Sequence, residues 1–258
     1  WTTLVSKTEV ATADMGSDGV GSYVSTWQFD HGLLTFGGDG CVDVLSSETP
    51  GWQPYAGAIE KAKLDTLSNI RELAGGLFKG CKALTELRLT NDGRTLKHFQ
   101  TSDMSDTKIE KLTLPASINT IGSNTLHNMT SLKRLNIECL NYKVANTSGP
   151  SYYVLYGCSA LEEINLAGDY YKETFYDFLS TDAGNNLVMG LAQPTKLLIN
   201  GREIHTVKIS ASETKNRMFN NLSNIKYVVL DKSDMSVPSD IFKGSSVKHV
   251  TVYATNPA

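Results

Sequence analysis

The stretch Leu126-His-Asn-Met-Thr-Ser-Leu132-Lys-Arg-Leu135-Asn-Ile137 holds the pattern that decides the fold: an apolar residue, a short polar turn, and then three spaced apolar residues. The spacing [Leu/Ile/Val]-x-x-[Leu/Ile/Val]-x-[Leu/Ile/Val] begins at seven positions, which are Leu84, Ile109, Leu132, Leu161, Ile204, Ile225 and Val247. The gaps between successive starts are 25, 23, 29, 43, 21 and 22 residues, and 43 is close to two units. A recurring unit of this length is typical of stacked repeat proteins.

Each unit has an apolar anchor, a tight turn and an extended segment. The anchors that precede the turns are Phe78, Leu126, Leu155, Phe219 and Phe242. In the extended segment the second and third apolar positions alternate with polar neighbours, which is the period of a half-buried strand. One unit cannot bury its own apolar side, so stacking must build the core. The residues that we expect to be almost inaccessible to solvent are Phe78, Leu87, Leu112, Leu135, Ile164, Phe219 and Val228.

Longer segments resemble a known family. Residues 107–122 (TKIEKLTLPASINTIG), together with Leu77-Phe-Lys-Gly-Cys81 and Ile241-Phe-Lys-Gly-Ser245, resemble the BspA-type leucine-rich repeat from about Leu64 to Val252. Residues 27–40 and the later Pro50-Gly-Trp52 are similar to a segment that often precedes these arrays. The resemblance implies an α/β fold, namely a right-handed leucine-rich repeat solenoid. It would carry a parallel β-sheet on one face and short helices or turns on the other.

The chain divides into a cap and an array. Residues 1–60 are expected to form a β-rich N-terminal cap, in which a β-hairpin turns at His31-Gly32 and residues 37–40 (GGDG) make a turn or bulge. Residues 61–258 are the repeat array, with one further degenerate strand within residues 59–73. An irregular insertion occupies about 169–200, and residues 183–186 (AGNN) are read as a loop.

Composition and charge restrict the possible functions and locations. The net charge of −3 gives no electrostatic footprint for a nucleic acid. No stretch of apolar residues is long enough for a transmembrane helix. The chain begins at Trp1 and not at Met, so we expect that a signal peptide has been removed. The family resemblance implies a secreted or cell-surface bacterial protein.

The sequence contains no motif that predicts chemistry. It has no G-x-S-x-G, P-loop, G-x-G-x-x-G or H-E-x-x-H pattern, and the five histidines lie singly. Without a C-x-x-C pair the four cysteines do not predict a zinc site, and we expect them to be reduced. Cys81 and Cys158 share one slot of the repeat, which suits a small buried side chain. We therefore predict no enzyme, metal or cofactor; an enzyme or enzyme accessory with its site in residues 169–200 is the alternative.

The remaining candidate is the surface of the stacked strands, where side chains between the apolar positions point away from the core. The candidate binding face comprises Glu86, Arg88, Lys111, Arg134, Asn136, Glu163, Asn165, Lys208, Tyr227, Val229, His249 and Thr251. Its mixed charge favours an extracellular protein partner in an adhesion role, with a hot spot at the less polar C-terminal end. A solvated face without a ligand is the alternative. A glycan is the other candidate ligand, held by Tyr170, Tyr171, Tyr176 and Phe178 of the insertion.

Overall fold

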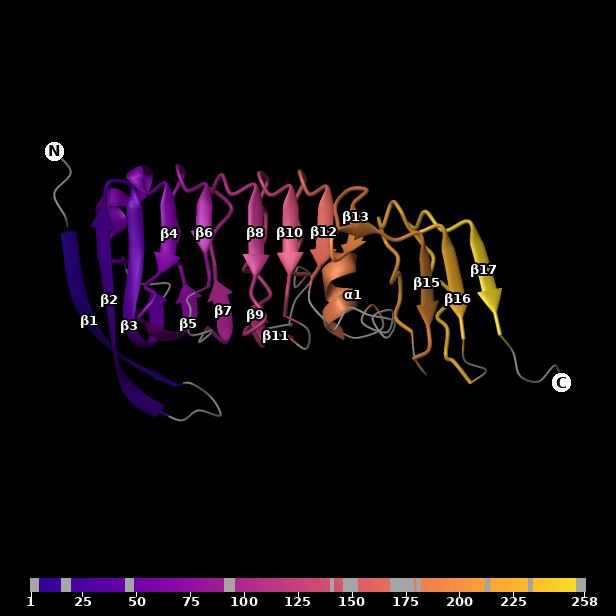
Figure 1. The fold of residues 1–258 in the computed structure, drawn as a ribbon, viewed down its shortest axis with the longest axis horizontal. Helices are drawn as coiled ribbons and strands as arrows, with labels where there is room; N and C mark the ends of the chain where they lie inside the picture. Colours follow the sequence, from indigo (N-terminus) through magenta and orange to yellow (C-terminus); the bar gives the residue numbers. More distant parts are fainter. Residues whose placement is uncertain are drawn as a thin grey trace.

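The protein is an elongated array of short strands, seen in a computed structural model (Figure 1). The structure describes residues 5–14, 20–44, 49–90, 96–139, 142–145, 153–167, 179, 182–211, 214–231 and 234–253. The N-terminal strands lie at one end of the array, the C-terminal strands lie at the other, and the strands between follow sequence order (Figure 1). This is the solenoid that the repeat pattern predicted.

Two rows of strands run along the array. The main row contains β4 (Lys61–Leu64), β6 (Glu86–Arg88), β8 (Lys111–Leu114), β10 (Arg134–Ile137), β12 (Glu163–Leu166), β13 (Lys196–Ile199), β15 (Thr206–Ile209), β16 (Tyr227–Leu230) and β17 (His249–Val252). The second row contains β5 (Asn69–Gly75), β7 (His98–Thr101), β9 (Thr120–Gly122) and β11 (Lys143–Ala145). Within each row, neighbouring strands that are hydrogen-bonded to one another run parallel. Parallel neighbours are possible because each coil brings the chain back to the same edge.

The tight turn of each unit depends on one backbone conformation. The second residue after the anchor has a positive φ in five units: Gly80 (75°), Asn128 (55°), Gly157 (77°), Asn221 (55°) and Gly244 (75°). Glycine has no Cβ to clash there, and asparagine tolerates this region better than most residues do. The positive φ required at this position of the turn therefore explains why it is occupied by glycine or asparagine in these five units.

The core fills the space between the two rows. All seven residues predicted to be inaccessible are buried, and Phe78, Ile164 and Phe219 are completely so. Cys81 and Cys158 occupy buried slots, as predicted. All four cysteines are free thiols, and burial raises the pKa of the Cys158 thiol to about 11.

The N-terminal cap is continuous with this core. β1 (Val5–Asp14), β2 (Val20–Asp30) and β3 (Leu33–Val44) form an antiparallel meander, and the predicted hairpin turns at His31 and Gly32, both with positive φ. β3 pairs with β4 through its first half and with β5 through its second, with a register shift between Gly40 and Cys41. Gly40 pairs with Ile70 and Cys41 with Glu72, so the extra residue of this bulge is Arg71 of β5. Residues 37–40, predicted to be a turn or bulge, instead lie inside the continuous strand β3, which serves both rows.

Aromatic packing joins the cap to the first coil. Trp52 precedes the 3₁₀ helix η2 (Gln53–Ala58), and its indole Nε1 donates to the Leu77 carbonyl at 2.9 Å. The Phe36 ring lies edge-on to Trp52 and Phe78, with centroids 5.2 and 6.1 Å away. Such edge contacts are favourable for aromatic rings. The first coil thus has its apolar side covered.

The repeat pattern predicted that the main row forms one hydrogen-bonded sheet, and this prediction is wrong. The main row comprises β4–β6, then β8–β10–β12–β13, then β15–β16–β17. The second break follows the antiparallel pairing of β13 with β14 (Arg202–Glu203) through the turn at Asn200 and Gly201. Across it, the Asn224 side chain accepts from Leu197 N at 2.9 Å and donates to Leu197 O at 2.8 Å. A side-chain amide thus replaces a missing rung of the ladder.

Two strands depart from the predicted positions. β13 has buried Leu197 and half-buried Ile199, but Pro194 stands where the pattern requires an aliphatic residue, so the sequence did not reveal it. The single degenerate strand expected in residues 59–73 is in fact two strands, β4 and β5, one in each row. Ala62 replaces the expected aliphatic residue in β4 and is nevertheless buried.

The side opposite the main row also differs in part from the prediction of helices or turns. In the N-terminal half it carries strands of the second row, because Leu73, Phe99 and Ile121 stack as inward residues of paired strands. The loop predicted at residues 183–186 lies within helix α1 (Asp182–Met189), which contacts β11. Burial of Leu187 and Val188 stabilises this helix, and the Asn186 side chain accepts from Val154 N at 2.9 Å.

The pattern predicted that the last coil buries its apolar residues, but two of these residues are exposed. Val250 and Val252 are 43% and 61% exposed, although they occupy the slots that are buried in other units. β17 pairs with β16 on one side, and none of the described residues forms a further coil on its other side. An inward position is buried only when a neighbour lies on both sides.

Candidate binding face

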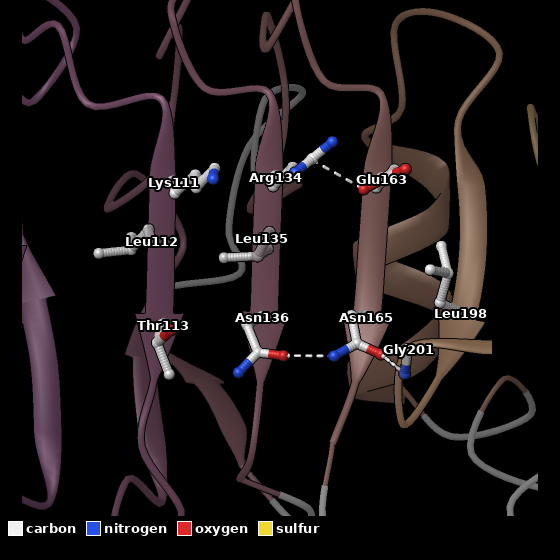
Figure 2. Close-up of a pocket in the computed structure, with 10 residues that line it drawn as sticks. All are labelled: Lys111, Leu112, Thr113, Arg134, Leu135, Asn136, Glu163, Asn165, Leu198 and Gly201. Atoms are coloured by element: carbon white, nitrogen blue, oxygen red, sulfur yellow. Dashed lines mark hydrogen bonds and ion pairs between the residues drawn. The ribbon is translucent and has the colours of Figure 1, made fainter.

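The main row presents two lines of side chains to the solvent. The register pairs Arg134 with Lys111 on one side and with Glu163 on the other. Two residues further along, Asn136 is paired with Thr113 and Asn165 in the same way. Because alternate residues of a strand point to the same side, the two lines cross β8, β10 and β12 side by side (Figure 2). All twelve residues of the predicted face lie on main-row strands, and none of them is buried.

Bonds between strands hold these lines in place. Arg134 Nε lies 2.9 Å from Glu163 Oε2, and Asn165 Nδ2 donates to Asn136 Oδ1 at 2.6 Å (Figure 2). Asn165 Oδ1 in turn accepts from the backbone N–H of Gly201 at 2.9 Å. The pairing therefore extends from β10 to the β13–β14 turn, and the side chains have defined positions before any ligand binds.

A hollow of about 280 Å³ lies over this part of the face. Its lining consists of Lys111, Leu112, Thr113, Arg134, Leu135, Asn136, Glu163, Asn165, Leu198 and Gly201. Five of these residues, Lys111, Arg134, Asn136, Glu163 and Asn165, belong to the predicted face. We call this hollow the central pocket. The predicted hot spot was at the C-terminal end, whereas the central pocket lies in the middle of the array.

The C-terminal end of the face carries an aromatic pair. The rings of Tyr227 and His249 are stacked with centroids 5.1 Å apart and an interplanar angle of 9°, and Tyr227 is 48% exposed. Val229 is half-buried, and Lys208 is paired with Asp231. The stack forms a flat aromatic surface that is partly accessible to solvent.

The structure adds residues that the repeat pattern did not place on the face. Lys61 and Lys63 point outward from β4, and Lys196 and Leu198 do so from β13. They were missed because neither strand fits the pattern. With them, the outward positions of the main-row strands hold seven basic residues and two acidic ones, Glu86 and Glu163. The face is net positive on a chain of net charge −3.

Ion pairs use some of this charge. A hydrogen bond from Arg88 holds the pKa of Glu86 below its usual value, and Lys61 also pairs with Glu86 at 3.5 Å. The hydrogen bond from Lys196 similarly lowers the pKa of Glu203. The hydrogen bond from Lys133 and, to a smaller extent, the charge of Lys111 lower the pKa of Glu110. The Lys111 side chain itself forms no hydrogen bond or ion pair with any residue in the described ranges. Its ammonium group is therefore the cation of the central pocket that lacks a partner there.

The described part of the chain offers no alternative site of a familiar kind. It has no group of three or more His, Cys, Asp or Glu side chains that could hold a metal ion. Among the described helices, none has the length and apolar character needed to cross a membrane. The aromatic residues predicted to bind a glycan, Tyr170, Tyr171, Tyr176 and Phe178, lie outside the described residues.

The repeated coils and their turn chemistry define a leucine-rich repeat protein, and comparison with protein families agrees. The model described as BspA type Leucine rich repeat region matches residues 55–179 and 196–257 in six copies. The chain belongs to this family, as the resemblance indicated. No curated protein matches it.

Three solved structures are similar to this chain at low identity. A leucine-rich repeat protein from Bacteroides ovatus is 15% identical, with a TM-score of 0.39 over 76% of this chain and 45% of its own. A leucine rich cell surface protein from Faecalibacterium prausnitzii is 8% identical, with a TM-score of 0.29 over 89% and 93%. A leucine-rich repeat protein from Eubacterium ventriosum is 12% identical, with a TM-score of 0.25 over 94% of this chain and 85% of its own. The chain thus spans less than half the length of the first of these proteins.

Proposed function

We propose that this chain is a non-enzymatic binding module that acts in adhesion at the bacterial surface or after secretion. In this proposal the outward face of the main row binds a protein partner. The observation that carries it is the ordered double line of polar side chains across β8, β10 and β12, fixed by the Arg134–Glu163 and Asn136–Asn165 bonds. A face whose side chains are already fixed loses less conformational entropy when it binds.

The Tyr227–His249 stack is the proposed hot spot. Aromatic side chains supply much of the energy at interface centres, and Tyr227 exposes a flat ring with little freedom to lose. Family membership supports the location, because BspA-type repeats are common in surface and secreted proteins. The glycan alternative rests on the aromatic segment outside the described residues, and it stays a prediction.

The test is to screen purified extracellular proteins, and in parallel a glycan array, for binding to this chain. The affinity of any captured protein is then measured for the chain and for a double variant. Replacing Tyr227→Ala and His249→Ala should weaken binding of a captured protein by about 2 kcal/mol or more, if the stack is the interface centre. The melting temperature should change by only a few degrees, because neither side chain is buried.

Tyr156→Ala is the matched control. Tyr156 is 49% exposed and also contacts a histidine, His127, but it lies in a turn and not on the main-row face. Its replacement should leave affinity unchanged. Equal losses in the two variants, or no loss in either, would reject the stack as the hot spot. Turnover of a glycan or peptide that one carboxylate substitution abolishes would reject the non-enzymatic assignment.

A further inference from the structure

The central pocket has an excess of hydrogen-bond donors on one side. Asn136 Oδ1 and Asn165 Oδ1 already accept hydrogen bonds, from Asn165 and Gly201. The ammonium group of Lys111, in contrast, only donates, and no described residue accepts from it. Figure 2 shows Lys111 Nζ on the side of β8 that faces β10, with the Thr113 hydroxyl further along the same strand. A ligand at this position would have to supply acceptors.

Charge points to the same ligand chemistry. Lys111 and Arg134 are register partners on neighbouring strands, which lie about 4.8 Å apart. Like charges side by side on a sheet are unfavourable. Glu163 compensates Arg134, and the acid on the preceding strand, Glu86, is paired with Lys61 and Arg88. An anionic group between Lys111 and Arg134 would remove the repulsion and accept charge-assisted hydrogen bonds from both.

We infer that the central pocket binds the carboxylate of an acidic side chain from the protein partner, between Lys111 and Arg134. This inference rests on the proposed function and names the partner's chemistry: an acidic peptide segment. Two residues further along the same strands, Thr113 has a hydroxyl donor, and the Asn136 amide, which donates to Glu138 Oε1 at 3.4 Å, has a second N–H. Half-buried Leu198 offers an apolar contact at the other end of the pocket.

An acidic peptide fits the face better than an acidic polysaccharide does. The basic line is interrupted by Glu86 and Glu163, which would repel a polymer that carries a negative charge at every unit. A peptide can place neutral residues opposite these acids and carboxylates opposite the lysines. The wider excess of basic over acidic positions would also attract the peptide over a longer range.

The probe is a fluorescent peptide in which Glu alternates with Ser, compared with its Gln counterpart on the full chain. The Glu peptide should bind about tenfold more tightly or better, since each hydrogen bond to a charged group contributes substantially. Lys111→Gln should remove most of this preference, and adding Arg134→Gln should remove the rest. Raised ionic strength should weaken the Glu peptide more than the Gln peptide.

Lys143→Gln is the matched control, because Lys143 is an exposed lysine of the second row and its loss changes the net charge equally. It should leave the Glu preference intact. Equal binding of the two peptides, no binding of either, or equal effects of Lys111→Gln and Lys143→Gln would overturn the inference. Polygalacturonate is the third probe, and tighter Lys111-dependent binding of this polymer than of the peptide would also overturn it.

The two proposals can fail separately. A partner captured through the Tyr227–His249 stack keeps the proposed function even if Lys111→Gln has no effect on the peptide, in which case the pocket inference alone is wrong. Conversely, the Tyr227→Ala and His249→Ala double variant could retain full affinity for the captured partner, which would reject the hot spot. Binding of the Glu peptide that depends on Lys111 would still support the pocket inference.

Discussion

The middle of the array and its C-terminal end contain the same sequence pattern and bury it differently. In β10 and β12 the inward residues Leu135, Ile137, Ile164 and Leu166 are almost completely inaccessible. In β17 the residues in the same slots are 43% and 61% exposed. The pattern thus specifies which side of a strand faces inward, while the neighbouring coils decide whether that side is buried.

The outer faces of these two regions differ as well. Across β8, β10 and β12 the side chains are bonded to one another and surround the central pocket. At the C-terminal end, the face presents the stacked Tyr227 and His249. One region therefore offers donors and charge, and the other offers aromatic area. Single substitutions in the two regions can show whether they also differ in how much their buried residues stabilise the fold.

The largest expected effect is at Phe219, the anchor between β15 and β16. Phe219→Ala should lower the free energy of unfolding by about 3–5 kcal/mol, because it leaves a cavity in a completely buried site. Phe242, whose ring stacks on Phe219 at 5.5 Å, is only half-buried, so Phe242→Ala should cost clearly less. Reversible denaturant unfolding measures both. A loss under about 1 kcal/mol for Phe219→Ala would show that it is not an anchor.

A pair of glycines tests how tightly the middle coils approach one another. Both Gly157 and Gly201 have φ of 77°, so alanine costs about 1–2 kcal/mol at either position. At Gly157 an added Cβ would also lie 1.9 Å from Asn128 Oδ1, whereas at Gly201 it would meet nothing within 4 Å. Gly157→Ala should therefore destabilise more in thermal unfolding. Equal shifts in melting temperature would mean that the Asn128 side chain moves away without cost.

Two valines in register give the most direct test of the comparison. Val228 of β16 is paired with Val250 of β17, and the two are 1% and 43% exposed. Val228→Ala should cost about 2 kcal/mol through lost burial and a cavity, and Val250→Ala should cost less than about 1 kcal/mol. Comparable losses of unfolding free energy would show that Val250 is covered in solution.

The smallest effect is expected on the outer face. Arg88 is an exposed side chain paired with Glu86, and such surface pairs contribute little. Arg88→Ala should therefore change the free energy of unfolding by no more than about 0.5 kcal/mol. A larger loss, measured by the same denaturant unfolding, would indicate that the outer ion pairs stabilise the array.

The sequence determined the architecture because each unit repeats the requirement that fixes it. Apolar spacing set the inward side of seven strands, and a glycine or asparagine in five turns supplied the positive φ that those coils need. The alternation also placed the twelve outward residues of the face, since the side-chain period of a strand leaves no other choice.

The tertiary structure alone decided what depends on neighbours. β13 lacks the aliphatic residue at Pro194, and β4 has Ala62 in place of one, yet both join the main row because adjacent strands supply their hydrogen bonds. Their three lysines raise the net charge of the outward positions from +2 to +5. Within the described residues, the central pocket, the lack of an ion-pair partner for Lys111 and the exposure of the last strand depend on how coils lie beside one another, which no single repeat encodes. Local spacing fixes the direction of a side chain, whereas burial and charge compensation depend on what stacks beside it.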